Sequence, residues 1–520
     1  MTIIYHNGIV LTQNRSQPRA TAFGVKDGVI IGVGKKEDFN ITGAIYYDLN
    51  GKTVLPGFND AHIHLWKVGQ LAAFILDLRG IKSIRAIQEA IKKAAAQVPA
   101  GRWIIGRGFN EAVLEEKRMP IANDLDIASP EHPVYLIRTC AHIASVNSKA
   151  LEVCMVDEKT VSPSGGVIGK TNNKPNGLFF ETALSLITKY IPAVSAEDYS
   201  EMIRIGAQKL SKAGVTSITD PAVHPELASA YKNFSDGTLP VRLNLMPVML
   251  PDGGDIPFPL PEKYSGLWQK MDTVKFFSDG GLSGATAALS RNYKNRSDSG
   301  ILRVEKEKFL ELTRAARIKG FAIGTHAIGD RAIGQVLEVY QSLQNEFGRC
   351  RNRIEHFGLP TDEQLELAAK TNTVAVPQAI FLNELGDNFI NTLDDQYLRR
   401  CYPLKTLIRN NIPFALSTDA PVVKNFNPWS GIQSAVLRKS SSGTIISPDE
   451  KLTVAEALEA YTLGGAFAEG SEAIKGSIQT KKLADFILLN KNPLELIPDE
   501  LESIITDAVF IDGKEIISED

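Results

Sequence analysis

The sequence has few cysteines and no long apolar run. The four cysteines, Cys140, Cys154, Cys350 and Cys401, are widely separated and form no Cys-x-x-Cys pair, which favours a reduced, cytoplasmic setting over a disulfide framework. No stretch supplies the roughly 18 consecutive apolar residues of a membrane span, so a membrane is not an expected partner. The first twenty residues are interrupted by polar side chains and lack the apolar core of a secretory signal.

The chain also lacks an excess of charge of either sign. It carries 57 lysine and arginine residues against 60 aspartate and glutamate residues, a formal net charge of -3. Binding to nucleic acid phosphates requires an excess of positive charge, so nucleic acid is not an expected partner. With 520 residues, of which 43% are hydrophobic, the chain is long enough for one large domain with insertions or for two to three domains.

Both ends of the chain have the pattern of short strands joined by turns. The dipeptides Asn7-Gly8, Asp27-Gly28 and Asp512-Gly513 separate short apolar runs and are signals for hairpin turns. The similar texture of the two ends predicts one small β-sandwich domain assembled from residues 1–53 and 470–520.

Between the two ends, strands alternate with amphipathic helices. The candidate strands are residues 53–56, 215–219, 241–245, 274–277, 321–325, 353–356, 374–376 and 414–418. Helical patterns separate most of them, at residues 197–213, 305–319, 331–346, 362–370 and 396–409. Eight strands with intervening helices predict an α/β fold, a (β/α)8 TIM barrel that spans residues 54–469.

One connection in this barrel is anomalously long. About 150 residues separate His64 from Val215, where a single helix would suffice. We therefore expect a large insertion after strand 1, at about residues 70–205, with at least one strand at 133–138. An insertion at this position is expected to cover the site.

Two histidines lie one residue apart in Leu55-Pro-Gly-Phe-Asn-Asp-Ala-His62-Ile-His64. Side chains at positions i and i+2 of a strand point in the same direction, so His62 and His64 can share one metal ion. Histidine pairs also occur at plain surface or core positions of strands, so the pair alone leaves both interpretations open.

Further polar residues lie at the ends of other candidate strands, where the reacting groups of such barrels are found. Strand 4 supplies Lys275, strand 5 His326, strand 6 His356 and strand 8 Asp419. Each has a structural alternative, such as a buried histidine with ordinary partners or an aspartate that caps a turn. A lysine in a buried strand, however, is costly unless it is paired or modified. Together with the histidine pair, these residues offer the nitrogen and oxygen ligands that a divalent transition metal prefers.

With these residues the chain resembles the metal-dependent amidohydrolase superfamily, and more narrowly the branch that contains N-substituted formamide deformylase. The resemblance covers essentially the whole chain and lies in the segments Asn7-Gly8-Ile-Val, Val274-Lys-Phe-Phe-Ser-Asp-Gly280, His326-Ala-Ile-Gly-Asp-Arg-Ala332, Arg353-Ile-Glu-His356, Ser417-Thr-Asp-Ala-Pro-Val422 and Lys482-Leu-Ala-Asp-Phe-Ile-Leu-Leu489. Two segments depart from the pattern: Gly108-Phe-Asn-Glu111 replaces Gly-Trp-Asp-Glu, and Gln378-Ala379 replaces Gln-Pro. Neither is expected to contact a metal ligand, and both put the substrate in doubt.

The resemblance implies a centre for one or two divalent ions, zinc being the expected metal. His62, His64 and Asp419 would hold the more buried ion, and His326 and His356 the more exposed one. Lys275, carboxylated by CO2 to N6-carboxylysine, would bridge the two ions, whereas an unmodified ammonium group would imply a single metal.

The resemblance also implies catalytic roles. A metal-bound water becomes a hydroxide nucleophile near neutral pH, and Asp419 would accept its proton and pass it to the leaving amine. His142 is the candidate for a second donor to the oxyanion, with a structural histidine as the alternative. Asp279, Asp330 and Glu355 lie close to ligands in the sequence and would orient imidazoles, unless they are solvated turn residues.

These features predict a hydrolase that cleaves a carbon-nitrogen bond, in an amide or N-formyl group of a small molecule. Hydrolysis of an ester, lactone or phosphotriester at the same metal centre is an alternative, because the hydroxide does not itself select the bond. A non-catalytic binding or scaffold protein is a third interpretation, and it predicts the loss of ligands that are all present here. The identity of the substrate and the oligomeric state, a homodimer included, stay open.

Overall fold

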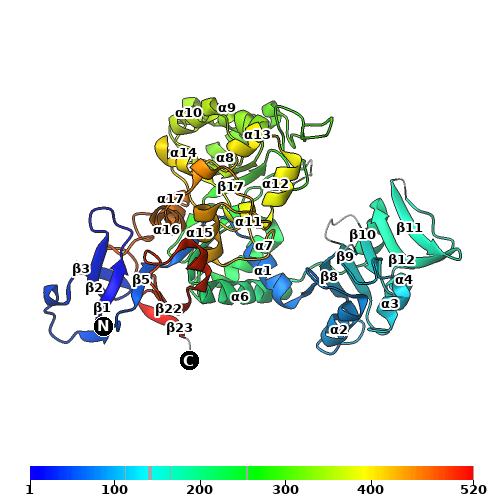
Figure 1. Ribbon diagram of the computed structural model, residues 1–520, viewed down its shortest axis with the longest axis horizontal. Helices are drawn as coiled ribbons and strands as arrows, with labels where there is room; N and C mark the ends of the chain where they lie inside the picture. The colour runs from blue at the N-terminus through cyan, green and yellow to red at the C-terminus, as the bar shows by residue number, and fades with distance from the viewer. Residues whose placement is uncertain (112, 139–142, 164, 253, 255, 519–520) are drawn as a thin grey trace. The chain divides into compact units, whose positions relative to one another are not determined.

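The computed structural model describes residues 1–111, 113–138, 143–163, 165–252, 254 and 256–518. The chain divides into two compact units, one built from Met1–Leu65 and Ala207–Asp520 and the other from Trp66–Gly206 (Figure 1). Among the helices in the described ranges, none combines the length and the apolar character that a membrane crossing requires.

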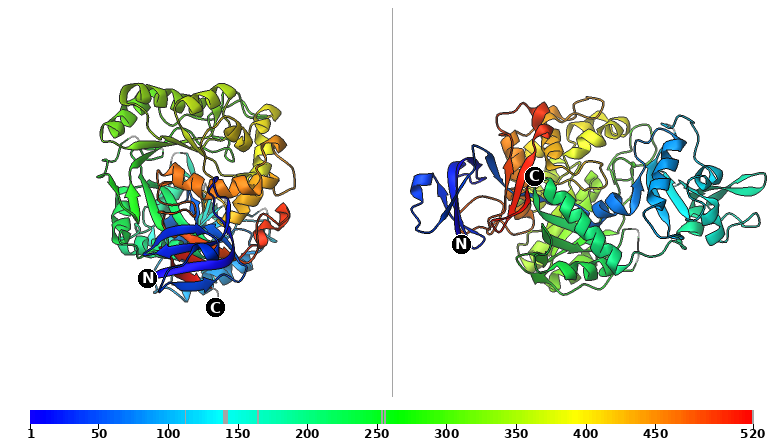
Figure 2. Two further views of the ribbon diagram at one scale, coloured as in Figure 1. Left: turned by 90° about the vertical axis from the view of Figure 1, so that its left-hand side faces the viewer. Right: turned by 90° about the horizontal axis from the view of Figure 1, so that it is seen from below.

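Both ends of the chain contribute strands to one eight-stranded sheet in the first unit (Figure 2). Its order is β23-β22-β21-β5-β1-β2-β3, with β4 also paired to β1. The strands are β1 (Thr2–Leu11), β2 (Arg19–Lys26), β3 (Val29–Gly34), β4 (Ile45–Asp48), β5 (Thr53–Pro56), β21 (Phe486–Leu489), β22 (Thr506–Ile511) and β23 (Lys514–Ser518). Four aromatic rings from both ends pack together at its centre, those of Tyr5, Phe23, Phe486 and Phe510.

Two sequence-based expectations for this sheet were wrong. Asn7-Gly8 is not a hairpin turn but lies within β1, where Asn7 has a φ of 60° and the pairing with β2 shifts register, as at a β-bulge. Residues 53–56 do not form the first strand of the central α/β region, because β5 pairs with β1 and β21. A short apolar strand that is buried throughout carries no signal for which sheet it joins.

Parallel strands form the centre of the first unit. They are β6 (Phe58–Asp60), β13 (Val215–Val223), β14 (Arg242–Pro247), β17 (Thr273–Phe277), β18 (Ala322–Ala327), β19 (Arg353–His356) and β20 (Val374–Val376). β6 pairs with β13 and β13 with β14, while β17 to β20 pair in chain order. β14 also pairs with β16 (Gln269–Met271), which pairs with β15 (Tyr264–Ser265).

The parallel strands form two groups, one of β6, β13 and β14 and the other of β17 to β20. Single backbone contacts link the two groups on both sides. A parallel bridge joins Val248, just after β14, to Lys275 of β17, and another joins Ala375 of β20 to Phe414. The backbone N–H of Asp419 then donates to the carbonyl of His62, 2.7 Å away. The contacts therefore run from β6 through β20 to the extended segment 414–418 and back to the chain that follows β6.

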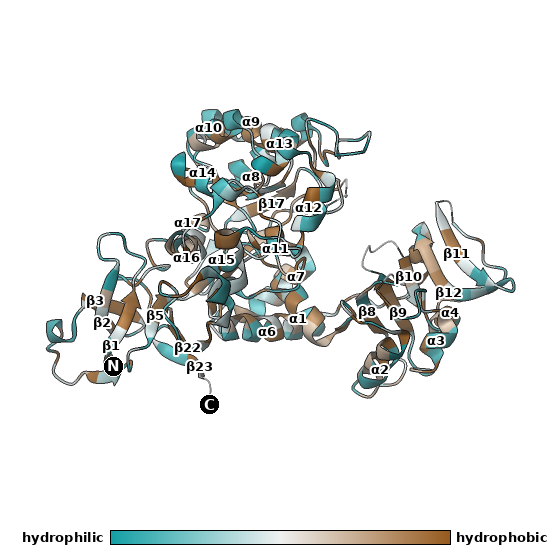
Figure 3. Cartoon of the chain, viewed as in Figure 1, coloured by the Kyte–Doolittle hydropathy of each residue, from teal (hydrophilic) through white to brown (hydrophobic). Residues whose placement is uncertain are grey.

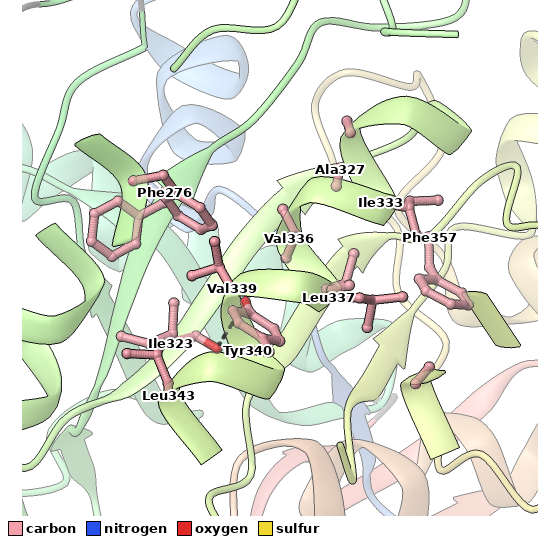
Figure 4. Packing of buried hydrophobic residues seen from close by; sticks show 14 of the residues in the cluster. Phe276, Ile323, Ala327, Ile333, Val336, Leu337, Val339, Tyr340, Leu343 and Phe357 are labelled. Carbon is pink, nitrogen blue, oxygen red and sulfur yellow. Dashed lines mark hydrogen bonds between the residues drawn. The ribbon is translucent and has the colours of Figure 1, made fainter. Parts of the chain in front are cut away.

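Helices that follow the strands bury one face against them. Those at the predicted positions are α6 (Ala196–Lys212), α8 (Lys306–Ile318), α9 (Asp330–Phe347) and α10 (Asp362–Lys370). In α9 the buried residues Ile333, Val336, Leu337 and Tyr340 recur at the spacing of one helix face (Figure 4). The Tyr340 hydroxyl donates to the carbonyl of Arg353, 2.9 Å away, which attaches α9 to β19.

The helix predicted at residues 396–409 is divided into α13 (Asp395–Arg399) and α14 (Leu404–Arg409). Tyr402 has a φ of 48°, and Pro403 has no backbone N–H, so a continuous helix cannot pass through this point. The remaining helices of this unit are α7 (Pro225–Tyr231), α11 (Ile380–Glu384), α12 (Gly386–Thr392), α15 (Pro428–Leu437), α16 (Val454–Tyr461) and α17 (Leu463–Ala468).

The second unit contains a six-stranded sheet in the order β11-β12-β10-β9-β8-β7. Its strands are β7 (Ile75–Asp77), β8 (Ile104–Phe109), β9 (Val134–Arg138), β10 (Ile143–Val146), β11 (Gly166–Thr171) and β12 (Lys174–Glu181), and its helices include α2 (Ile84–Ala95), α3 (Ala122–Asp126) and α4 (Ser148–Val153). Figure 3 shows that β8 and β9 are largely hydrophobic. Only β9 stands out in the sequence, because the other strands are short or interrupted by glycine.

Candidate metal centre

Three predicted ligands meet where β6 and the segment 414–418 end. His62 and His64 lie in the loop directly after β6 rather than within a strand, and Asp419 follows the neighbouring segment. One nitrogen of each imidazole and one oxygen of Asp419 all lie within 4.8 Å of one another. The Nε2 atoms of His62 and His64 are 3.5 and 3.3 Å from Oδ1 of Asp419. Two nitrogens and one carboxylate oxygen are a ligand set that suits a divalent transition metal.

His326 and His356 lie beside this group, at the ends of the adjacent strands β18 and β19. Their ring centroids are 4.4 Å apart, and the His356 ring is 5.1 Å from that of His62. The four predicted histidines therefore form one continuous cluster with Asp419. β18 and β19, the predicted strands 5 and 6, are parallel neighbours, so both rings lie at the same edge of the sheet.

Lys275, the remaining predicted ligand, is 1% exposed in β17. Its Nζ atom lies 4.9 Å from the centroid of the Phe277 ring. Burial lowers the pKa of Lys275 to about 8, although the nearby carboxylates of Glu355 and Asp419 favour the charged form. Burial therefore favours the neutral amine more than in an exposed lysine, and the neutral amine is the form that reacts with CO2 to give a carbamate.

The charge states of the other groups suit metal binding. Burial alone would raise the pKa of Asp419, but His62, His64 and His356 outweigh it and hold the pKa well below its ordinary value. Burial lowers the pKa of His356 to about 3 and that of His326 well below its usual range. The centre therefore combines an ionised carboxylate with neutral imidazoles at His326 and His356, which have the free lone pair that a metal ligand needs.

One carboxylate oxygen of Asp419 faces the two imidazoles of this group. Oδ1 is buried and accepts no hydrogen bond of normal geometry from any residue that the structure describes. A buried carboxylate oxygen that receives no hydrogen bond carries a desolvation cost, which a cation bound by it and the two imidazoles would offset. The residues present therefore fit a bound divalent metal.

Glu355 fixes the orientation of His62. Its Oε2 atom lies 2.5 Å from Nδ1 of His62, while Arg353 donates from Nε to Oε1 at 2.6 Å. Burial would raise the pKa of Glu355, but Arg353 and His62 reverse this and hold the pKa well below its ordinary value. Because Nδ1 faces a carboxylate, Nε2 is the ring nitrogen of His62 that faces Asp419. The predicted role of Glu355 in orienting an imidazole agrees with this geometry.

The other two predicted orienting aspartates differ from each other. Asp279 lies 3.4 Å from Nε2 of His326 and accepts backbone hydrogen bonds from Ala288, Ile328 and Gly329. Asp330 is buried, but its carboxylate binds the Ser290 hydroxyl and the Arg400 guanidinium at 2.6 and 2.8 Å. For Asp330 the expectation of an imidazole partner was wrong, and so was the solvated alternative.

Three polar residues of the centre were missed from the sequence or given another role. Gln378, expected to contact no ligand, has its Oε1 atom 2.6 Å from Nδ1 of His356. Asp220 has its Oδ1 atom 3.8 Å from Nδ1 of His64 and accepts a hydrogen bond from Tyr231. Asp60 accepts from the hydroxyl of Thr418 at 2.6 Å, and burial raises its pKa to about 7. Gln378 and Asp220 each follow a predicted strand, so the rule that found the ligands could have found them.

His326 also has a backbone partner. Its Nε2 atom is 3.1 Å from the carbonyl oxygen of Gly280, so Nδ1 is the ring nitrogen left to bind a metal. His142, the predicted oxyanion donor, lies outside the described residues together with Cys140.

Comparisons with known proteins give a consistent result. The model of the amidohydrolase family matches residues 46–517. The chain is 33% identical over 529 residues to YtcJ of Bacillus subtilis (strain 168), named as an amidohydrolase, with 99% of both chains covered. It is 26% identical to N-substituted formamide deformylase of Arthrobacter pascens, covering 90% of this chain and 88% of that one.

A solved structure extends this similarity to three dimensions. The crystal structure of an uncharacterized metal-dependent hydrolase from Pyrococcus horikoshii OT3 superposes with a TM-score of 0.79 at 25% sequence identity. The match covers 96% of this chain and 99% of that chain.

Proposed function

Because this chain belongs to the amidohydrolase family, we propose that it is a metal-dependent hydrolase that cleaves a carbon-nitrogen bond in an amide or N-formyl group of a small molecule. The observation that carries the metal-dependent part is Oδ1 of Asp419, which is buried without a hydrogen bond and faces the Nε2 atoms of His62 and His64. The carbon-nitrogen part is supported by the similarity to N-substituted formamide deformylase.

For the fold, we propose that the eight parallel segments, from β6 to the segment 414–418, form a (β/α)8 barrel that begins after β5 and extends to about residue 469, interrupted by an insertion at about 70–205. The unbroken sequence of parallel contacts from β6 to the segment 414–418 and back supports closure. Residues 1–53 and 470–520, with the rest of β5, would form a β-sandwich domain, and the one sheet to which they contribute supports its assembly from both ends of the chain.

For the metal, we propose that His62, His64 and Asp419 hold one divalent ion, with zinc as the expected identity. His326 and His356 would hold a second ion, and Lys275 would bridge the two as N6-carboxylysine. The burial of Lys275 and its lowered pKa support carboxylation, because the uncharged amine is the reactive form. The close approach of His326 to His356 supports a shared second site.

When bound, the metal lowers the pKa of a water ligand and polarises the substrate carbonyl. Asp419 is placed to accept the proton of the attacking water, because its carboxylate is ionised and lies at the centre beside His62 and His64. The same carboxylate then returns the proton to the leaving nitrogen, which departs as a neutral amine. Glu355 keeps Nε2 of His62 directed at the centre throughout. His142 stays the proposed donor to the carbonyl oxygen as it becomes negatively charged.

We further propose a cytoplasmic location and a small-molecule substrate, with a homodimer as a proposed assembly. Cys154, Cys350 and Cys401 are free thiols, which supports a reducing compartment.

A substrate panel with matched variants tests the function. Wild-type protein and Asp419→Asn are assayed against N-formyl and N-acyl amines, esters, lactones and phosphotriesters, and divalent metal is measured in each preparation. We expect the wild type to hydrolyse a carbon-nitrogen substrate and Asp419→Asn to lose at least about 100-fold of that activity. Turnover of esters or phosphotriesters alone would favour the alternative reaction classes, and the absence of both metal and turnover would favour a scaffold.

A further inference from the structure

Gln378 lies fully buried directly after β20, next to the metal centre. Its side-chain amide makes three contacts. Nε2 donates to the carbonyl of Val376 and to the hydroxyl oxygen of Ser417, each 2.8 Å away. Oε1 lies 2.6 Å from Nδ1 of His356.

These partners permit only one orientation of the amide. A carboxamide has two N–H donors on nitrogen and only acceptor sites on oxygen. The Val376 carbonyl can only accept, so the NH2 group must face it. The Ser417 hydroxyl donates to the carbonyl of Pro377, 3.3 Å away, which leaves its oxygen to accept from Gln378. Rotating the amide by 180° would place two carbonyl oxygens in contact and lose the bond to Val376.

The orientation of the amide determines the tautomer of His356. Because Oε1 can only accept, Nδ1 of His356 must carry the proton. A metal-ligating imidazole is neutral and has one N–H, so Nε2 keeps its lone pair. The rest of the environment fixes the ring plane but not the proton: His356 stacks on Phe381 at 6.1 Å and meets the His326 ring at 4.4 Å.

We propose that Gln378 is a positioning residue for the metal centre, which holds His356 as the Nδ1-protonated tautomer and directs the Nε2 lone pair at the second metal position. This inference rests on the metal-binding part of the proposed function and is independent of the bond that is cleaved. Gln378 thus serves His356 as Glu355 serves His62, with the difference that its acceptor is neutral.

Three variants of the full-length protein separate this role from simple packing. Gln378→Leu removes the acceptor at similar volume, Gln378→Glu keeps an acceptor for Nδ1, and Ser417→Ala removes one neighbour but leaves the Val376 carbonyl to orient the amide. The probe is Co2+, titrated in competition with a chelator, with stoichiometry and visible absorption recorded. Melting of the metal-free proteins reports folding.

We expect Gln378→Leu to weaken binding of one Co2+ ion by about 10- to 100-fold and to change its absorption spectrum. Gln378→Glu is expected to recover most of that affinity, and Ser417→Ala to stay within about threefold of wild type. A Gln378→Leu protein that folds like wild type and binds Co2+ with unchanged affinity and spectrum would overturn the proposal.

If Gln378→Leu does not fold, the wild-type protein decides the question. Histidine ring nitrogens labelled with 15N, with His356 assigned by comparison with His356→Asn, report the tautomer in the metal-free state. A proton on Nδ1 supports the proposal and a proton on Nε2 refutes it. A protein that binds Co2+ in this way but hydrolyses no substrate would leave the inference intact while the proposed reaction fails.

Discussion

The hydroxyl of Thr418 donates a hydrogen bond to Oδ2 of Asp60 across 2.6 Å. Asp60 ends β6, just before the histidine pair, and Thr418 directly precedes Asp419. The backbone N–H groups of His62 and Thr418 also donate to the same carboxylate, at 3.2 and 3.1 Å. One buried side chain thereby holds together the two segments that carry the proposed ligands, although they are far apart in the sequence.

Thr418→Val is therefore expected to weaken both the fold and the metal centre. Removing the hydroxyl leaves one oxygen of Asp60 without its donor, which costs about 1–3 kcal/mol of the free energy of unfolding. Denaturant titration measures this loss, and chelator competition is expected to show weaker metal binding. The matched control is Thr313→Val, whose buried hydroxyl donates within α8, to the carbonyls of Phe309 and Leu310. Equal effects of the two substitutions on metal affinity would contradict the linking role of Asp60.

Glu355→Gln is expected to destabilise the metal-free protein at neutral pH. The substitution leaves the buried Arg353 guanidinium without its charged partner, which costs about 3–5 kcal/mol for a pair of this kind. The folded-state pKa of Glu355 is depressed, so its stabilising contribution is present above the unfolded pKa of about 4.3 and is lost as the pH falls below it. Unfolding curves at pH 7 and pH 4 should show a smaller difference between variant and wild type at the lower pH. A difference that grows as the pH falls would show that the sign is wrong.

Two buried tyrosines should respond oppositely to loss of their hydroxyl groups. The Tyr402 hydroxyl has no hydrogen-bond partner among the described residues, whereas that of Tyr397 contacts the Ser290 hydroxyl and the Arg291 backbone N–H, both at 3.1 Å. Tyr397→Phe should lower the free energy of unfolding by about 1 kcal/mol, while Tyr402→Phe should leave it unchanged or raise it slightly. Thermal melting of both variants checks this, and a larger loss for Tyr402→Phe would reveal a partner for its hydroxyl.

Lys275→Met should lower the number of bound metal ions without impairing folding. The variant removes an amine whose burial disfavours its charge, so the metal-free protein is expected to melt at or above the wild-type temperature. Without the bridging carbamate, bound zinc should fall from two ions to one per chain. Elemental analysis of proteins reconstituted with zinc provides the count. A variant that still holds two ions would show that Lys275 is not a bridging ligand.

The positions of the predicted ligands followed from the sequence because one rule applies to all of them. Polar residues at the ends of parallel strands meet at one edge, and this rule brought His326 and His356 together with Asp419. The hydrogen-bond partners of these ligands could not be predicted from the sequence. Whether Asp330 or Glu355 reaches an imidazole depends on side-chain direction and on how neighbouring segments approach, and sequence spacing contains neither.

In the fold, too, the elements with a repeating apolar pattern were predicted, whereas the sheet that a short strand joins was not. The helical period predicted α9 to within a residue at each end, because its apolar face repeats over several turns. The assignment of residues 53–56 failed, because a four-residue apolar strand fits the terminal sheet as well as the central one.

The central claim is that hydrolysis depends on a divalent metal held through Asp419, and reconstitution of metal-free protein tests it most directly. Wild-type protein is stripped with a chelator, zinc is returned in measured equivalents, and release of acid from an N-formyl or N-acyl amine found to be a substrate is followed at each step. We predict no turnover without metal, turnover that rises in proportion to bound zinc, and no recovery for Asp419→Asn at the same zinc concentration. Full activity of the stripped wild type, or equal recovery of Asp419→Asn, would contradict the account.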